Sequence, residues 1–206
     1  MLVLGVISPH PPVIIPEIGG EEAKKAINTI MSLKSAAKML ANTNPDRLLI
    51  ISPHQEHGYN VPLHYLKKDL KQDIKIDKIL VTDVSYEYYY NLGKLYGEKI
   101  EKAKERTAVI ASGDLSHVLK PEGPYGYDPA GPKLDEIIVR AVKEKNFEML
   151  LNIDQEILEH GAECGLRPIL FLFGVFEMID FSSKVLSYEA PFGVGYMVAL
   201  FYKKEG

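Results

Sequence analysis

The sequence predicts an α/β domain of three layers, in which helices flank a mostly parallel central sheet and two antiparallel strands close it at the C-terminal end. Short, continuous aliphatic runs alternate with amphipathic helical segments along most of the chain, which is typical of parallel strands buried on both faces. Near the C-terminus the pattern changes to two alternating apolar and polar segments joined by Ala-Pro-Phe-Gly. That change indicates an antiparallel pair of strands.

A first βαβ unit is expected at the start of the chain. The aliphatic run at 2–7 stops at Pro9, and residues 21–40 then carry apolar side chains at spacings near 3.6, which predicts a helix. A second aliphatic strand follows at 47–51. Two strands joined by a helix in this way lie parallel, with a right-handed crossover.

The alternation continues through the middle of the chain. Strands are expected at 78–83 and 107–112, with a helix at 86–103 between them. The amphipathic segment 133–145 is expected to cover the sheet as a helix, and 166–178, which is apolar on nearly every side, predicts a buried helix.

The last two strands are expected at 184–188 and 194–202. The second of these could pair with a second subunit, and we expect a homo-oligomer. The segments 55–65 and 118–132 are expected to be loops that supply the lining of a binding site.

Composition indicates one soluble domain that covers 1–206. Of the 206 residues, 46% are hydrophobic and 25% are charged, which leaves room for a sizeable core. The net charge is -4, and no basic block with interleaved aromatic residues is present. We therefore expect no nucleic-acid partner.

The same reading favours a cytoplasmic protein with no membrane contact. The longest apolar runs, such as 169–176, are far shorter than the roughly 20 residues that span a bilayer. No basic segment precedes the apolar start of the chain. A single cysteine, Cys164, excludes an internal disulfide and agrees with a reducing compartment.

Histidines follow three of the expected parallel strands. The stretch ISPH ends at His10 and again at His54, and the third strand leads into Gly-Asp-Leu-Ser-His, which ends at His117. Each proline stops its strand because it cannot donate to the ladder. Since parallel strands point their carboxyl ends at one rim, these imidazoles are expected to meet there and to form a metal or general-base site.

A metal held by two histidines needs a further ligand, and a carboxylate would complete the triad that leaves positions open on iron. The candidate carboxylates are those of Asp114, Glu163, Glu56 and Glu17. Glu163 stands out because it precedes the buried helix at 166–178, where its charge needs either a cation or the helix N-terminus as partner.

At this point the chain resembles the class III extradiol ring-cleavage dioxygenases of the catalytic B-subunit, or LigB-like, type, and the related Memo-like proteins. The resemblance covers nearly the whole chain. It rests on six motifs: SPHPP, SPH, SGDLSH, DPAGPKLD, ECGLRPI and YEAPFGVGYMVA.

The resemblance implies a non-haem Fe(II) held by His10, His54 and Glu163. It implies that His117 is the acid/base residue and that Asp114 orients it. Such a site opens the ring of a small, catechol-like aromatic substrate with O2, since open positions on one iron admit both reactants while a base removes a phenolic proton.

Two further residues are substrate-binding candidates. His57 is expected to face the substrate or to lie on a surface loop, and Arg167 to bind a substrate carboxylate or to pair with Glu163 or Asp114.

Memo-like relatives offer an alternative third ligand, because they resemble this chain in carrying a cysteine where Cys164 lies. A thiolate ligand would favour zinc or copper. The alternatives to ring cleavage are therefore a Memo-like adaptor or pathway protein, and a zinc-dependent hydrolase in which His117 is the base.

Overall fold

The computed structural model, which describes residues 1–204, contains one six-stranded sheet of order β3-β2-β4-β1-β6-β5. β1 to β4 run parallel to one another, whereas β6 lies antiparallel to both β1 and β5, as the sequence predicts. The strands are β1 Leu2–Ser8, β2 Arg47–Ser52, β3 Lys75–Leu80, β4 Thr107–Ser112, β5 Phe181–Glu189 and β6 Tyr196–Lys203.

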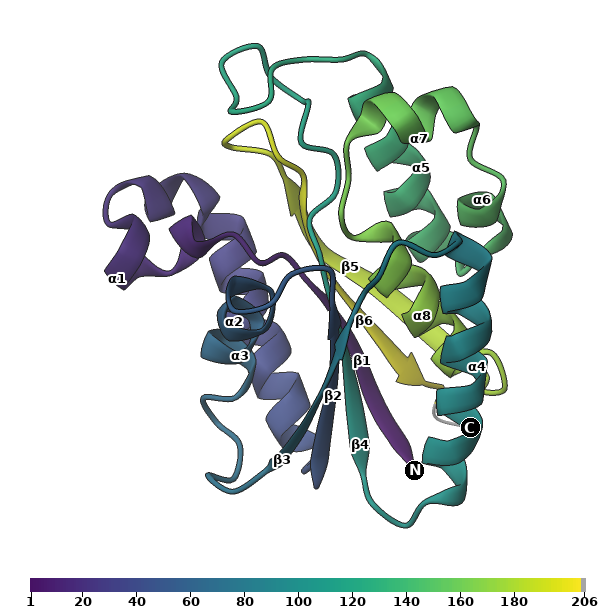
Figure 1. Ribbon diagram of the computed structural model, residues 1–206. Helices are drawn as coiled ribbons and strands as arrows, with labels where there is room; N and C mark the ends of the chain where they lie inside the picture. The colour runs from purple at the N-terminus through teal and green to yellow at the C-terminus, as the bar shows by residue number, and fades with distance from the viewer. Residues whose placement is uncertain (205–206) are drawn as a thin grey trace.

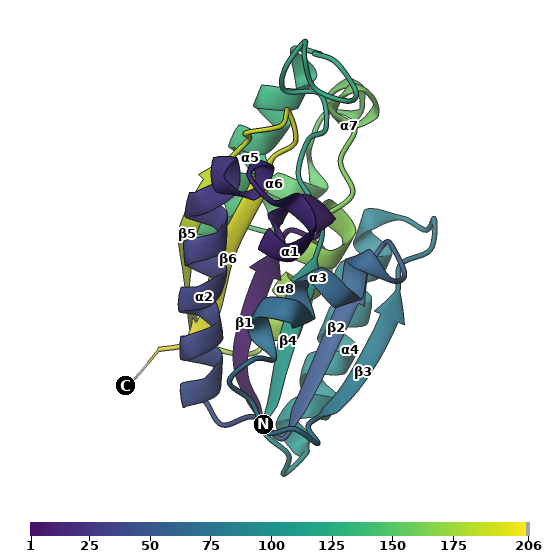
Figure 2. The ribbon, with the colours of Figure 1, turned by 90° about the vertical axis from the view of Figure 1, so that its left-hand side faces the viewer.

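Helices cover both faces of this sheet (Figure 1). The helices α1 to α3 lie on one side and α4 to α8 on the other, and Figure 2 shows α2 beside β5 and β6 and α3 over β2 and β4. Their bounds are α1 Pro16–Gly19, α2 Ile27–Asn42, α3 His57–Leu66, α4 Tyr86–Lys102, α5 Ala130–Glu144, α6 Glu148–Leu151, α7 Gln155–Gly161 and α8 Leu166–Phe176, with short 3-10 helices at Pro12–Ile14 and Glu22–Ala26.

The strands in the middle of the sheet are apolar throughout because both of their faces are buried. In β4, Val109 and Ala111 contact the core beneath α4 and α8, while Ala108 and Ile110 contact the core beneath α2 and α3. Alternate residues along the strand therefore pack into two separate hydrophobic cores, one on each face of the sheet. Among the described residues, no helix combines the length and apolar character that crossing a membrane requires.

Two expectations about individual segments are wrong. Residues 55–65, expected as a loop, are mostly helix α3, because the apolar face that includes Tyr59, Tyr65 and Leu66 packs against the sheet. The strand expected at 194–202 is present as β6, but its expected pairing with a second subunit is wrong. Instead, β6 pairs with β1 on one side and with β5 on the other. It has no free edge, so it does not offer a second subunit a strand to pair with.

The parallel strands end side by side at one rim. β4 lies between β1 and β2, and Ser8 at the end of β1 is in register with Ser112 at the end of β4. Ser8, Ser52 and Ser112 are all fully buried at these ends. The residues that follow them in the chain consequently project into the crevice above the sheet, where ligands bind in open α/β folds.

Candidate metal centre

Three histidines form a cluster at this rim. The ring of His10 lies 5.2 Å from that of His54 and 5.3 Å from that of His57, and the last two rings stack at 5.0 Å. Each residue offers one nitrogen within 4.8 Å of the others, which is close enough for one ion to contact all three. His57 reaches the cluster because Glu56, at φ 43°, turns the chain sharply into α3.

The hydrogen bonds around His10 determine which of its nitrogens is free. Pro62 lies inside α3 and has no N–H to donate to the carbonyl of Gly58, so that carbonyl accepts the Ser112 hydroxyl instead. The Ser112 hydroxyl has one proton, which this bond uses. In the hydrogen bond between the Ser112 hydroxyl and His10 Nδ1, at 3.0 Å, the proton must then come from the imidazole. His10 therefore carries its proton on Nδ1 and presents a bare Nε2, as a metal ligand should.

His10 and His54 are neutral at ordinary pH, because their pKa values lie below the usual range for histidine. Burial, reinforced by the neighbouring His54, lowers the pKa of His10 to about 3, and His10 is only 2% exposed. Burial and the neighbouring His57 also lower the pKa of His54, which lies nearer the solvent. Neutral imidazole is the form that binds a metal, so the cluster is a suitable donor set for a divalent transition metal.

A second group of possible ligands shares His10. Its Nε2 lies 3.6 Å from Cys164 Sγ and 3.8 Å from Asp114 Oδ2. Asp114 Oδ1 accepts the His10 backbone N–H at 3.0 Å, and burial raises the pKa of this carboxyl to about 7. Burial and the charge of Asp114 raise the pKa of the Cys164 thiol well above its usual range. A metal would have to displace that proton to use the thiolate.

His117 lies across the same pocket. Its Nε2 is 3.8 Å from Cys164 Sγ, its ring is 5.3 Å from that of Tyr125, and its backbone N–H donates to Ala162. Burial and the neighbouring His54 lower the pKa of His117, so the imidazole is neutral and able to accept a proton near pH 7.

Glu163 and Arg167 have partners other than the histidines. The carboxylate of Glu163 accepts the N–H of Leu166, at the start of α8, and the hydroxyl of Tyr86. Arg167 stacks over the Tyr86 ring and pairs with Asp83 at 2.9 Å. Glu163 thus has the helix-terminal environment that was the alternative to metal binding, and Arg167 is paired with an acid outside the pocket.

The other candidate acids also lie apart. Glu17 Oε2 is 3.9 Å from His64 Nε2 on the surface, and Glu56 is an exposed residue at the start of α3. Neither belongs to a group of possible metal ligands among residues 1–204.

The histidines open into a cavity of about 420 Å³, within the usual range for small-molecule sites. Its walls are mostly prolines and aromatic rings, with the titratable groups gathered on its floor. The lining residues are His10, Pro11, Pro12, Val13, His54, His57, Asp114, His117, Pro124, Tyr125, Phe192, Val194 and Tyr196.

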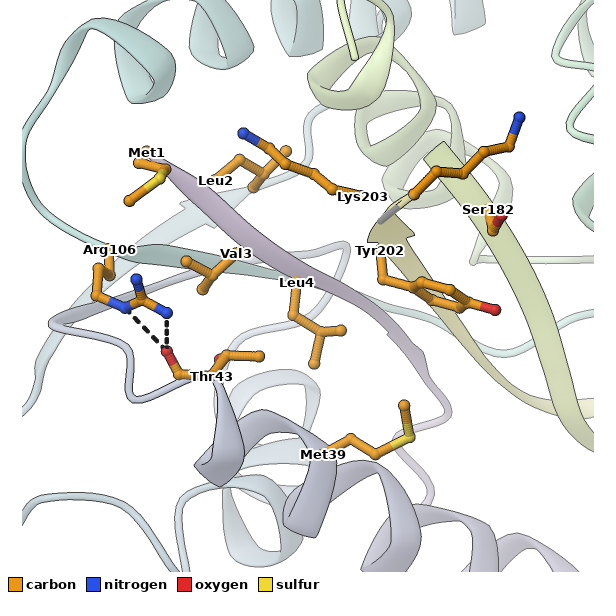
Figure 3. Close-up of a pocket in the computed structure, with 11 residues that line it drawn as sticks. Met1, Leu2, Val3, Leu4, Met39, Thr43, Arg106, Ser182, Tyr202 and Lys203 are labelled. Atoms are coloured by element: carbon orange, nitrogen blue, oxygen red, sulfur yellow. Dashed lines mark hydrogen bonds between the residues drawn. The ribbon is translucent and has the colours of Figure 1, made fainter. Parts of the chain in front are cut away.

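A larger cavity, of about 760 Å³, lies beside the other end of β1 (Figure 3). Its positively charged side chains are already paired: the Arg106 guanidinium donates to the Thr43 carbonyl, Lys203 pairs with Glu101, and Lys204 pairs with Asp180. None of its lining residues is a histidine, cysteine or acid. Size alone therefore does not identify the functional site in this molecule.

Sequence reasoning underestimated His57 and did not anticipate the aromatic walls. The spacing of His54 and His57, three residues apart, was the available signal, but it becomes informative only once α3 is known to begin between them. Tyr125 comes from the segment 118–132 and both Phe192 and Tyr196 from the segment 188–199, and the convergence of these two segments depends on the tertiary fold.

Comparison with known proteins identifies the family and the fold. Residues 55–199 match the family described as the catalytic LigB subunit of aromatic ring-opening dioxygenase. The solved structure of an uncharacterized protein, JW3007 from Escherichia coli K12, has a similar fold at a TM-score of 0.60 and 12% identity, covering 97% of this chain and 99% of that one.

Two relatives are similar in sequence. Protein CA_C1420 of Clostridium acetobutylicum is 30% identical over 92% of this chain and 55% of its own length. A MEMO1 family protein of Aquifex aeolicus is 31% identical over 61% of this chain and 42% of its own length. The chain spans about half the length of these curated relatives. With a family match over most of its residues, the chain belongs to the LigB family of aromatic ring-opening dioxygenase subunits and has Memo-like relatives.

Proposed function

We propose that this protein opens the ring of a catechol-like aromatic with O2, by extradiol-type chemistry that depends on one Fe(II) ion. The observation that carries the proposal is the convergence of three imidazole nitrogens on the floor of a 420 Å³ pocket. Membership of the LigB family supports the reaction class. We treat residues 1–206 as a single domain of the extradiol subunit-B type.

His10, His54 and His57 are the residues that would hold the ion. Three imidazole nitrogens on one side leave the pocket side open. Fe(II) there would supply the redox chemistry that allows O2 to react with an aromatic ring. His10 is the most rigid of the three, because its Nδ1–H is bonded to Ser112 and its backbone N–H to Asp114.

The remaining groups in the pocket act on the substrate. We assign His117 as the acid/base residue: its neutral imidazole accepts a proton from a ring hydroxyl and returns it to the product. Asp114 holds the His10 main chain, and the walls formed by Tyr125, Phe192 and Tyr196 exclude water from a planar ring.

The test is turnover after anaerobic loading with Fe(II). Oxygen uptake and the appearance of yellow ring-opened product are followed with a panel of substituted catechols. The unmodified protein is expected to consume oxygen, His117→Gln to keep its iron but lose turnover, and Glu163→Gln to keep both. Iron-loaded protein that consumes no oxygen with any catechol would contradict the proposal.

A second function is favoured by one specific contact, the approach of Cys164 Sγ to His10 Nε2 at 3.6 Å. A thiolate site of His10, Asp114 and Cys164 suits zinc or copper better than iron. The protein would then hold a metal without cleaving rings, as a Memo-like pathway component. Zinc or copper whose retention depends on Cys164 distinguishes this function, and zinc-dependent ester hydrolysis would indicate a hydrolase.

A further inference from the structure

Three of the sequence motifs that the histidine cluster does not use meet at one buried carboxylate. Asp135 ends the motif DPAGPKLD and is only 1% exposed within α5. It contacts Ser116 from SGDLSH, and Tyr188 and Gly195 from YEAPFGVGYMVA. The segment 113–117 is the one that delivers Asp114 and His117 to the pocket.

Both oxygens of Asp135 are used in this contact. Oδ1 accepts the backbone N–H of Ser116 at 2.7 Å, and Oδ2 accepts the hydroxyl of Tyr188 at 2.7 Å. Ser116 is the residue directly before His117, and its own carbonyl accepts the N–H of Gly195. The main chain that carries His117 is thereby held by α5 on one side and by Gly195, just before β6, on the other.

Two glycines make this close approach possible. A Cβ at Gly195 would lie 2.1 Å from Asp135 Oδ2, and one at Gly131 would lie 2.6 Å from the Ser116 hydroxyl. Real Cβ atoms do not approach so closely, so both positions exclude larger residues unless the loop moves. The packing fixes the carboxylate against the loop.

Burying a carboxylate costs desolvation free energy that packing alone does not require. Burial raises the pKa of Asp135 to about 7, although its bonds to Tyr188 and Ser116 favour the charged form. An apolar residue of similar size would avoid that desolvation. What an apolar residue could not provide is an acceptor for the Ser116 amide.

We propose that Asp135 is a positioning residue for His117, acting through the Ser116 N–H to set where the imidazole lies in the pocket. Its catalytic meaning rests on the proposed function, in which His117 transfers the proton. The positioning itself does not, because it depends only on the contacts of Asp135 with Ser116 and Tyr188.

The experiment is NMR of the metal-free protein with labelled histidine, in which the imidazole carbon–proton cross-peak of His117 is assigned by its loss in His117→Gln. Asp135→Ala removes the acceptor, and Asp135→Asn keeps an oxygen that can accept the Ser116 N–H. Glu136→Ala, which alters the exposed neighbour on α5, is the matched control. The distant His64 cross-peak reports whether the fold is intact.

Asp135→Ala is expected to shift or broaden the His117 cross-peak while that of His64 stays in place, and Asp135→Asn is expected to restore it. Should Asp135→Ala fail to fold, Asp135→Ser replaces it, since a serine hydroxyl is too short to reach the amide. An unchanged His117 cross-peak in Asp135→Ala would overturn the proposal. The proposal would also fail if Asp135→Asn shifted the His117 cross-peak as far as Asp135→Ala does. Ring cleavage that is absent in every form, with these shifts present, would reject the proposed function and leave the positioning role standing.

Discussion

The two ISPH segments have the same four residues and very different surroundings. His10 follows β1, which lies between β4 and β6, and the residue is only 2% exposed, with both Nδ1 and the backbone N–H bonded. His54 follows β2, which is next to the edge strand β3, and its imidazole is exposed and stacks on His57.

This difference shows that the place of a strand in the sheet, rather than the motif at its end, decides what the histidine can do. A buried imidazole with a fixed tautomer is a rigid ligand, whereas an exposed one can rotate and adapt. We therefore expect the two histidines to contribute unequally to metal binding.

The largest expected effect is on metal affinity when His10 is removed. His10→Ala is expected to weaken binding of Co(II), used as a visible probe, by more than about 100-fold, and His54→Ala by roughly tenfold. Losing an outer contact of a metal ligand typically costs about 10–100-fold in affinity, and we expect the loss of a ligand itself to cost more than that only at the rigid position, His10. Isothermal titration under nitrogen measures both. Equal losses for the two variants would remove the distinction between a rigid and an adaptable ligand.

The buried histidine should also make stability depend on pH. Burial holds the pKa of His10 at about 3 in the native state, whereas an unfolded histidine titrates near 6.5. The unfolded chain therefore binds more protons between these values, and the contribution of His10 to stability falls by roughly 1.4 kcal/mol per pH unit as the pH drops through that window.

Asp114 acts in the opposite direction, because burial raises its pKa to about 7 and the native state then gains stability as the pH falls toward 4. The difference between the unmodified protein and His10→Gln isolates the histidine. Urea unfolding in EDTA at pH 6.5 and 4.5 should show the unmodified protein losing roughly 2 kcal/mol more than the variant. Parallel pH dependences would show that His10 titrates normally.

A smaller effect is expected from the hydrogen bonds behind His10. Ser112→Ala removes the group that accepts its Nδ1 proton and should lower metal affinity by roughly tenfold, a typical cost for an outer contact. Pro62→Ala adds an N–H that competes for the Gly58 carbonyl and should act in the same direction. Nitrogen NMR of the metal-free protein is expected to show Nδ1–H in the unmodified protein, and an Nε2–H form there would contradict the assigned tautomer.

The smallest effect on metal binding is expected at Glu163. Glu163→Gln should leave metal affinity unchanged while lowering stability by about 1 kcal/mol, because the carboxylate accepts from Leu166 and Tyr86 and not from the cluster. Chemical denaturation and Co(II) titration of the same samples separate the two effects. A large loss of affinity would place Glu163 among the ligands after all.

The sequence predicts the parallel strands well, since burial on both faces leaves a continuous aliphatic run. The expected strand 107–112 coincides with β4, all of whose residues are buried. Helix α3 was missed because Gly58, Asn60 and Pro62 all disfavour a helix when tertiary packing is not considered.

The convergence of His10, His54 and His117 at one rim follows from the parallel direction of their strands, so the sequence predicts it. Which of two adjacent residues, Glu163 or Cys164, faces those histidines does not follow in this way. The chain reaches them through Ala162 at φ 49°, a backbone conformation rare for alanine that no residue pattern indicates.

The most direct test of the three-histidine site is the metal content of protein purified anaerobically without added metal, measured by mass spectrometry. The comparison needs the unmodified protein, His57→Ala, Cys164→Ala and Glu163→Gln. We expect stoichiometric iron in the unmodified protein, its retention in the Cys164 and Glu163 variants, and its loss in His57→Ala. Metal that stays in His57→Ala and disappears with Cys164 would contradict the three-histidine site and favour the thiolate site.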